Sequence, residues 1–97
     1  MRMVPRMATI AAWLRVDGDS VAQSLREVRE KLDSADGELV LDFSSVRRLD
    51  PAAVSAMESL AAAAEEKTIK LSLRGVNIEI YKVLKLVKLS RRFSFVA

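Results

Sequence analysis

The sequence predicts a small α/β domain in which one face of a β-sheet is covered by helices. Three observations lead to this fold class: a short apolar run continues into a turn and a capped helix between residues 38 and 57, predicted strands and helices alternate along the chain, and one predicted strand has a polar face. Alternating strands and helices are typical of βαβ units. The 97 residues are enough for one domain with its own core.

The stretch from Glu38 to Met57 is the centre of the predicted fold. Its first part, Glu38–Phe43, holds an apolar run that is long enough for a buried strand and too short for a buried helix. Asp50 is of a type that often caps a helix, because its carboxylate accepts hydrogen bonds from the free amides of the first turn. Pro51 suits the first helical position, where no amide hydrogen is needed. A helix is therefore expected from Pro51 to about Glu66, with an apolar stripe of Val54, Met57, Leu60, Ala61 and Ala64.

The chain before this stretch predicts one strand and one helix. Apolar and other side chains alternate over Met7–Val16, which is typical of a strand and places Trp13 on the less apolar face. Ser20 and Gln23 resemble a capping box, so a helix is expected to begin there and to end near Asp33. Its apolar residues have helical spacing and are Val21, Leu25, Val28 and Leu32.

The chain after it predicts a strand, a helix and a last strand. Ile69–Arg74 alternates between apolar and polar side chains, and we expect the polar face to be wet, so that helices cover only the other face of the sheet. Asn77 can cap a third helix. Its inward-facing residues are expected to be Ile80, Val83, Leu84 and Val87. Phe93–Val96 is predicted to be a short strand, which gives the order β-α-β-α-β-α-β.

Composition argues against several classes of function. The chain has no cysteine and no histidine, so it lacks thiolate chemistry, the usual general base near neutral pH and the commonest transition-metal ligand. It also has no glycine-rich phosphate loop. We therefore expect a protein that is not an enzyme and that binds no metal and no cofactor. The sequence contains neither a secretory signal nor an apolar run near the ~20 residues of a membrane span, so a cytoplasmic location is expected.

Charge is distributed unevenly along the chain. Residues 67–97 hold eight Lys and Arg but only one acid, Glu79, whereas residues 1–66 hold eight basic and twelve acidic side chains. The basic surface expected on the third helix consists of Lys82, Lys85, Lys88 and Arg92. Such a surface can attract acidic protein, nucleic acid or anionic lipid, or serve solubility only. Nucleic acid is disfavoured, because the strand pattern points Phe93 and Phe95 inward and leaves no stacking platform.

From Ala8 to Val96 the chain resembles the STAS domain family, the fold shared by bacterial anti-sigma-factor antagonists and the cytoplasmic tails of sulfate-type anion transporters. Residues 40–50, with the sequence VLDFSSVRRLD, match the family's strand and turn motif, vvlDlsgv…iD. Residues 83–89, VLKLVKL, followed by Phe93, match its helix motif, vLeltGl…f. The resemblance implies a mixed β-sheet with helices packed on one face. Neither motif is catalytic, so the resemblance implies an interaction module.

The chain departs from the family pattern directly after Asp50. In antagonists controlled by phosphorylation, this Asp is followed by a Ser or Thr that accepts a phosphate from the anti-sigma kinase; here Pro51, Ala52 and Ala53 follow. Ser55 is the nearest hydroxyl in the helix, but it lies a turn beyond the open helix end that would favour a phosphate. The resemblance therefore implies a module that is not switched at the usual position. Its partner-binding surface is expected to comprise Asp50, Pro51, Ala52, Ala53 and Met57, with Asp50 serving mainly as the structural cap.

Several partners stay open at this point. As an antagonist-like module, the protein would bind an anti-sigma factor or kinase and act in transcription regulation. As a structural STAS subunit, it would bind the ATPase of a transporter, as in phospholipid-trafficking ABC systems. A basic surface for nucleic acid or membrane is the third alternative, and the chain could also form a homodimer.

Overall fold

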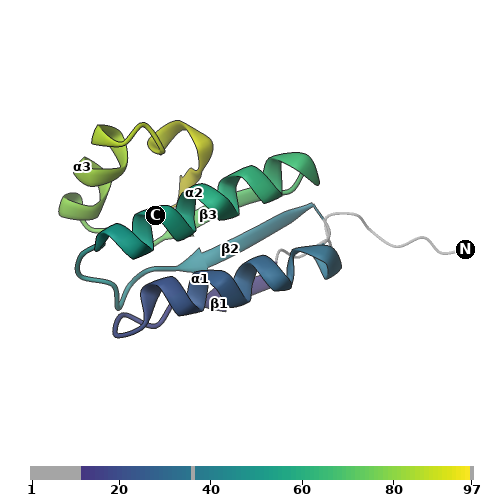
Figure 1. Cartoon of the computed structure of the whole chain (residues 1–97), viewed down its shortest axis with the longest axis horizontal. Coiled ribbons are helices and arrows are strands. Elements are labelled where there is room, and N and C mark those ends of the chain that lie inside the picture. The colour runs from purple at the N-terminus through teal and green to yellow at the C-terminus, as the bar shows by residue number, and fades with distance from the viewer. Residues whose placement is uncertain (1–11, 36, 97) are drawn as a thin grey trace, which may run out of the picture.

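The computed structural model describes residues 12–35 and 37–96, and its strands and helices alternate as predicted (Figure 1). The elements, in order, are β1 (Ala12–Arg15), α1 (Val21–Glu30), the 3-10 turn η2 (Leu32–Ser34), β2 (Glu38–Asp42), α2 (Pro51–Glu66), β3 (Lys70–Arg74), α3 (Ile78–Leu86), the 3-10 turn η3 (Ser90–Arg92) and β4 (Ser94–Val96). The strand expected over Met7–Val16 is described only from Ala12, and residues 7–11 of that prediction lie outside the described residues.

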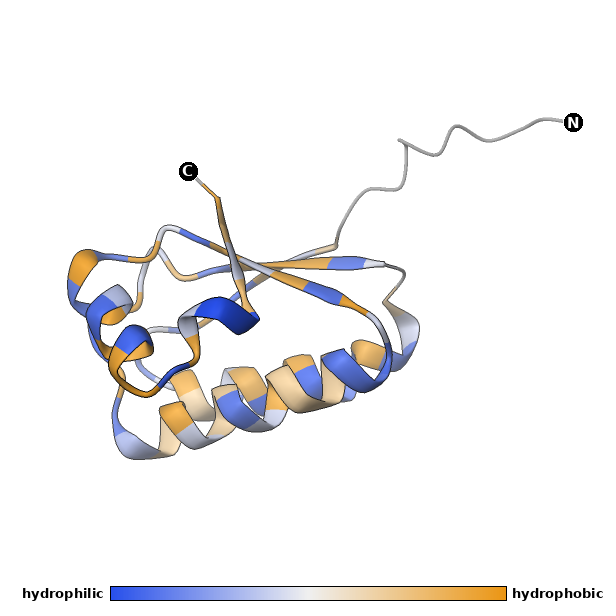
Figure 2. Cartoon of the chain, turned by 90° about the horizontal axis from the view of Figure 1, so that it is seen from above, coloured by the Kyte–Doolittle hydropathy of each residue, from blue (hydrophilic) through white to orange (hydrophobic). Residues whose placement is uncertain are grey.

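The four strands form one sheet in sequence order, and each neighbouring pair is parallel. The described part of the sheet is therefore parallel throughout, which differs from the expected mixed sheet. The register pairs Leu39 with Leu71 and Leu41 with Leu73, so leucines of β2 and β3 lie side by side on one face. Helices α1 and α2 lie next to each other along that face, and α3 stands at one end of the sheet (Figures 1 and 2).

The core fills the space between this face and the helices. Its largest fully buried side chains come from all three helices, from β2 and β3 and from the connecting segments: Val16, Leu25, Leu32, Leu39, Leu41, Phe43, Met57, Leu60, Leu73, Ile80, Leu84 and Leu89. Residues two apart on a strand and three or four apart on a helix share a face, which is why these apolar side chains meet. The predicted stripes of α1 and α2 are thus confirmed at most positions.

The start and end of α1 differ from the prediction. The Ser20 side chain makes no cap hydrogen bond, and Gln23 donates to Glu27 instead, so the predicted capping box is wrong. The turn before the helix is held by Asp17, whose carboxylate accepts the amide of Asp19 at 2.9 Å. The helix ends at Glu30 rather than near Asp33, and the tighter turn η2 that follows places Leu32 in the core.

The polar face of β3 is only partly in contact with water, in contrast to the prediction. Lys70 is exposed, but Ser72 is completely buried between neighbouring strands. Its hydroxyl donates to the carboxylate of Glu38 at 2.8 Å, across the β2–β3 pair. Burial of a hydroxyl is costly without a partner, and this hydrogen bond offsets that cost.

Thr68, just after α2, has an unusual backbone conformation that leads to a stability prediction. Its φ angle is +58°. The Thr68 amide donates to the carbonyl of Glu65 and the Ile69 amide to that of Ala64, as in a Schellman motif. A left-handed conformation costs an L-residue roughly 1–2 kcal/mol, and glycine avoids most of that cost. Thr68→Gly is therefore expected to raise the free energy of unfolding by about 1 kcal/mol, measured by urea denaturation. Thr68→Ala keeps a Cβ atom and should gain less; a glycine variant less stable than the wild type would contradict the prediction.

Candidate functional site at the start of helix α2

The start of α2 has the geometry predicted from the sequence. Asp50 is the N-cap, and its Oδ1 atom accepts a hydrogen bond from the amide of Ala53 at 2.8 Å. Pro51 is the first residue of the helix. Asp50, Pro51 and Ala52 are all exposed, so the first turn offers a small surface with a fixed backbone.

Two of the five residues expected to bind a partner are not on the surface. Ala53 and Met57 are each 0% exposed and lie in the core, so their assignment to the docking surface is wrong. The reason is helical spacing, since both continue the line of Leu60 and Ala64 that faces the sheet. The exposed side of α2 holds Ala52, Ser55 and Ser59 instead, at intervals of three and four residues.

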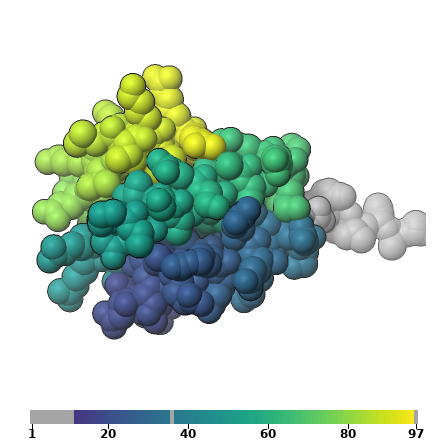
Figure 3. Space-filling view, viewed as in Figure 1, coloured from purple at the N-terminus to yellow at the C-terminus, as the bar shows by residue number. Residues whose placement is uncertain are grey.

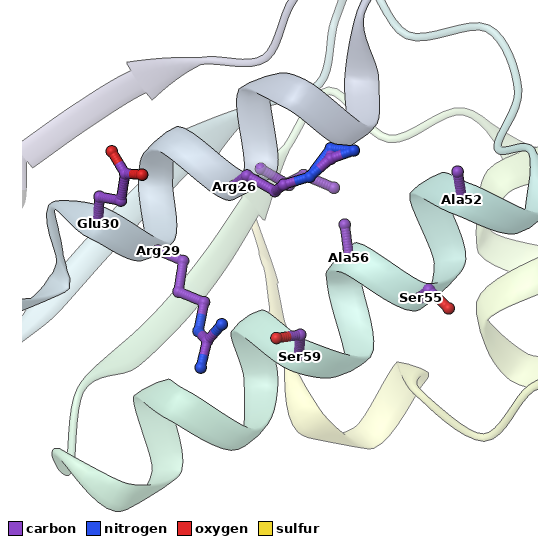
Figure 4. Close-up of a pocket in the computed structure, with 8 residues that line it drawn as sticks. Arg26, Arg29, Glu30, Ala52, Ser55, Ala56 and Ser59 are labelled. Carbon is purple, nitrogen blue, oxygen red and sulfur yellow. The ribbon is translucent and has the colours of Figure 1, made fainter.

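A groove of about 610 Å³ lies between α1 and α2 and begins beside Ala52. It remains open because α2 presents only small side chains there: Ala52, Ser55, Ala56 and Ser59. Arg26 and Arg29 of α1 line the other side of the groove, and in Figure 4 Arg29 reaches towards Ser59 of α2, whereas Glu30 points away. Figure 3 shows that the two helices form one continuous face of the molecule.

The loop between β2 and α2 is tied down on both sides. Asp42 Oδ1 accepts the amide of Ser44 at 3.0 Å, and hydrogen bonding by Ser44, with Arg74 and Arg15 nearby, holds the pKa of the Asp42 carboxyl below its ordinary value. The Ser45 hydroxyl donates to the carbonyl of Val16 at 3.1 Å. These contacts use the Asp and Ser of the strand motif for structure, and they fix the direction in which α2 leaves the sheet.

Asn77 joins this loop to α3. Its side-chain oxygen accepts the amide of Ile80 at 2.8 Å, which confirms the predicted cap, and its side-chain nitrogen donates to the carbonyls of Val46 and Arg47 at 3.3 and 3.2 Å. The first turns of α2 and α3 therefore lie at the same end of the molecule, as Figure 1 also shows.

The four residues of the expected basic surface do not form one helical face. Lys82 and Lys85 are exposed on α3, but Lys88 lies beyond its last residue, with φ +64°. Arg92 is held by Glu65 through two hydrogen bonds of 2.8 and 2.9 Å, and this contact lowers the pKa of the Glu65 carboxyl. The exposed basic side chains of α3 itself are thus Lys82 and Lys85.

Apolar side chains are also exposed around α3, which the sequence reasoning missed. Leu86 is 79% and Ile78 66% exposed, and Val87, predicted to face inward, is 37% exposed. Phe93 is buried as expected, whereas Phe95 is 37% exposed and its ring meets that of Tyr81 edge-on at 5.2 Å. A helical projection from Ile80 and Leu84 could have placed Ile78 and Leu86 on the outer side.

The described residues provide neither a metal site nor a membrane span. Over residues 12–35 and 37–96, no three His, Cys, Asp or Glu side chains are grouped so that they could hold an ion. None of the helices in this part of the chain is long and apolar enough to cross a membrane.

Comparison with known proteins identifies relatives of this fold. The family model described as "Mlab, STAS domain" matches residues 3–96. The STAS domain of a SulP transporter from Vibrio cholerae is 18% identical, with a TM-score of 0.74 over 98% of this chain and 77% of that one. A putative anti-sigma factor antagonist from Thermotoga maritima is 15% identical, with a TM-score of 0.62 over 87% and 71%. No curated protein matches the sequence.

Proposed function

Because the chain belongs to the Mlab, STAS domain family, we propose that it is a non-catalytic, cytoplasmic protein-interaction module that docks its partner at the start of α2. The observation that carries the proposal is the exposed, capped first turn formed by Asp50, Pro51 and Ala52. Its side chains are small, and the Asp50 carboxylate already accepts a hydrogen bond from the helix. The turn therefore suits recognition by shape rather than catalysis.

A rigid first turn suits a docking surface. The loop before α2 is held by Ser45 and Asn77, so binding would not have to order it. A preorganised surface keeps more of its contact energy for affinity. The open groove that continues from Ala52 towards Ser59 extends the area that a partner can cover.

The partner is expected to belong to one of two protein classes. One is an anti-sigma factor or kinase-like protein, which the module would bind as an antagonist in transcription regulation. The other is the ATPase of a transporter, to which it would be attached as a structural subunit. The docking surface is proposed to be the same in both cases, and identification of the bound protein distinguishes the two.

Ala52→Arg tests this surface. Ala52 is exposed in the first turn of α2, so the arginine should not disturb the core, but it would project into the partner. We expect thermal stability to stay near that of the wild type and recovery of the partner in affinity purification with mass spectrometry to fall about tenfold or more. Ala62→Arg places the same side chain on an exposed position far along α2 and is the matched control. Equal recovery with Ala52→Arg and Ala62→Arg would contradict the docking proposal.

The module is also proposed to bind without a phosphate switch at the start of α2. Pro51, Ala52 and Ala53 have no hydroxyl, whereas a phosphate there would bring about two negative charges into the interface. After incubation with ATP and the kinase-like partner, if the partner is of that class, the intact mass should be unchanged. A stoichiometric phosphate on any residue from Ser44 to Met57 would show that binding is switched in this segment.

A further inference from the structure

The outward side of α3 combines apolar and basic side chains in a way that the core does not require. Ile78, Lys82 and Leu86 lie four residues apart along the helix, and Lys85 lies beside them; we name these four residues the outer stripe. Ile80 and Leu84, which hold α3 to the body, point to the opposite side and are 0% exposed. The outer stripe is therefore not needed to pack this helix.

The two apolar members of the outer stripe are unusually exposed. Leu86 is 79% and Ile78 66% exposed, and a rise of about 1.5 Å per residue places their Cα atoms about 12 Å apart. A single exposed leucine needs no explanation, but Ile78 and Leu86 are both exposed on one side of the helix, near the exposed Tyr81, and this accumulation indicates an interaction site.

The charge of the outer stripe indicates what kind of surface would cover it. Among the described residues, neither Lys82 nor Lys85 takes part in an ion pair, and the ammonium of Lys85 lies 5.9 Å from the ring centroid of Tyr81. Lys88 and Arg91 add exposed positive charge just beyond the helix, and Glu79 is the one acid of α3. An acidic partner would pair with these lysines, and its apolar side chains would cover Ile78 and Leu86.

A protein surface fits the outer stripe better than a lipid bilayer. Helices that lie in a membrane interface have a continuous apolar face and a separate polar face. Here Lys82 lies between Ile78 and Leu86, so insertion of both apolar side chains would carry the lysine towards the acyl chains. Protein interfaces, by contrast, commonly combine a few apolar anchors with nearby charges.

We propose that the outer stripe of α3 is the second part of the docking surface and that it binds an acidic protein surface with apolar side chains at its centre. The proposal rests on the proposed function, which places the partner at the start of α2. Asn77 holds the first turn of α3 next to the loop that leads into α2. One partner can therefore contact both the first turn of α2 and the outer stripe.

The test uses the full chain labelled with ¹⁵N and two synthetic probes. One probe is an amphipathic helical peptide of roughly 16 residues made of glutamate, alanine and leucine, long enough to populate a helix. The other has every glutamate replaced by lysine. We expect the acidic peptide to shift the amide signals of residues 78–86 and to bind about tenfold more tightly than the lysine peptide.

Paired substitutions then separate the apolar from the charged contribution. Ile78→Ser with Leu86→Ser should weaken binding of the acidic peptide about tenfold, and Lys82→Glu with Lys85→Glu should reverse the preference in favour of the lysine peptide. Lys31→Glu with Lys70→Glu exchanges the same number of charges at exposed positions outside the first turn of α2, the groove and the outer stripe, and should leave the α3 shifts unchanged. All of these side chains are exposed, so thermal denaturation should show folded proteins.

Several results would overturn the inference. These are the absence of shifts in α3, equal binding of the two peptides, and α3 variants that bind like the wild type. Sedimentation with vesicles of three parts phosphatidylcholine to one part phosphatidylglycerol, lost in the Ile78→Ser, Leu86→Ser variant, would assign the stripe to a membrane instead. If partner recovery is insensitive to the α3 substitutions but is still lost with Ala52→Arg, the outer stripe is not part of the docking surface and the proposed function stands.

Discussion

Gly18→Ala is expected to destabilise the fold by about 3 kcal/mol, at the upper end of what overpacking usually costs. A Cβ atom at this position would lie 2.0 Å from the carbonyl oxygen of Ser45, far inside contact distance. The obstacle is backbone, so no side-chain rotation can remove it. The segment around Ser45 cannot shift easily either, because its hydroxyl is bonded to Val16, and the amide of Val16 donates to the carbonyl of Asp42 at 3.0 Å.

Gly37→Ala is the control that separates contact from backbone conformation. Gly37 has φ +91° and nothing lies within 4 Å of its added Cβ, so this substitution meets strain without a clash and should cost about 1 kcal/mol. Urea denaturation followed by circular dichroism gives both free energies of unfolding. A cost of Gly18→Ala no greater than that of Gly37→Ala would contradict a close approach of Gly18 to the carbonyl oxygen of Ser45.

The order of elements could be predicted because each one has a local cause. Apolar alternation marks the strands, a 3.6-residue period marks the helices, and Asp50 and Asn77 mark two helix starts with their own side chains. The resemblance to the STAS family predicted how these elements are arranged, and the match of the family model over residues 3–96 confirms the family. The alternation, the helical period and the cap residues each involve residues close together in the chain, so they can be recognised from the sequence alone.

The features that the sequence did not reveal depend on residues far apart in the chain. Ser72 is buried because Glu38, 34 residues earlier, accepts its hydrogen bond, and Arg92 is held by Glu65, which precedes it by 27 residues. The capping box is a local exception, because Ser20 is of a capping type but its side chain makes no such bond, and Asp17 holds the turn instead. Periodicity identifies which side of a helix is apolar, but not which partner each polar side chain will meet.

At the candidate site, sequence reasoning also failed to predict which neighbouring side chains reach the surface. Its position at the start of α2 could be predicted, since Asp50 and Pro51 define it, but Ala53 and Met57, which are close to them in sequence, do not lie on its surface. A helix turns by about 100° per residue, so neighbours in sequence face different directions. Ser59, two residues beyond Met57, lines the groove, whereas Met57 itself lies in the core.

Met57→Ala is expected to destabilise the fold by about 2–5 kcal/mol, the cost of removing a large buried side chain and leaving a cavity. Met57 is 0% exposed and is among the largest fully buried side chains of the described chain. Met57→Leu nearly preserves the volume and should cost less than about 1.5 kcal/mol. Thermal and urea denaturation of both variants gives the comparison.

The same two variants show whether Met57 acts through the core or through the partner. If its role is packing, Met57→Leu should bind the partner as the wild type does, and Met57→Ala should bind equally well per folded molecule once its lower stability is taken into account. A contact residue would behave differently, because Met57→Leu would then weaken binding while the free energy of unfolding stayed nearly constant. That outcome would require Met57 to leave the core in the complex, whereas unchanged affinity leaves Asp50, Pro51 and Ala52 as the part of the predicted surface that a partner can reach.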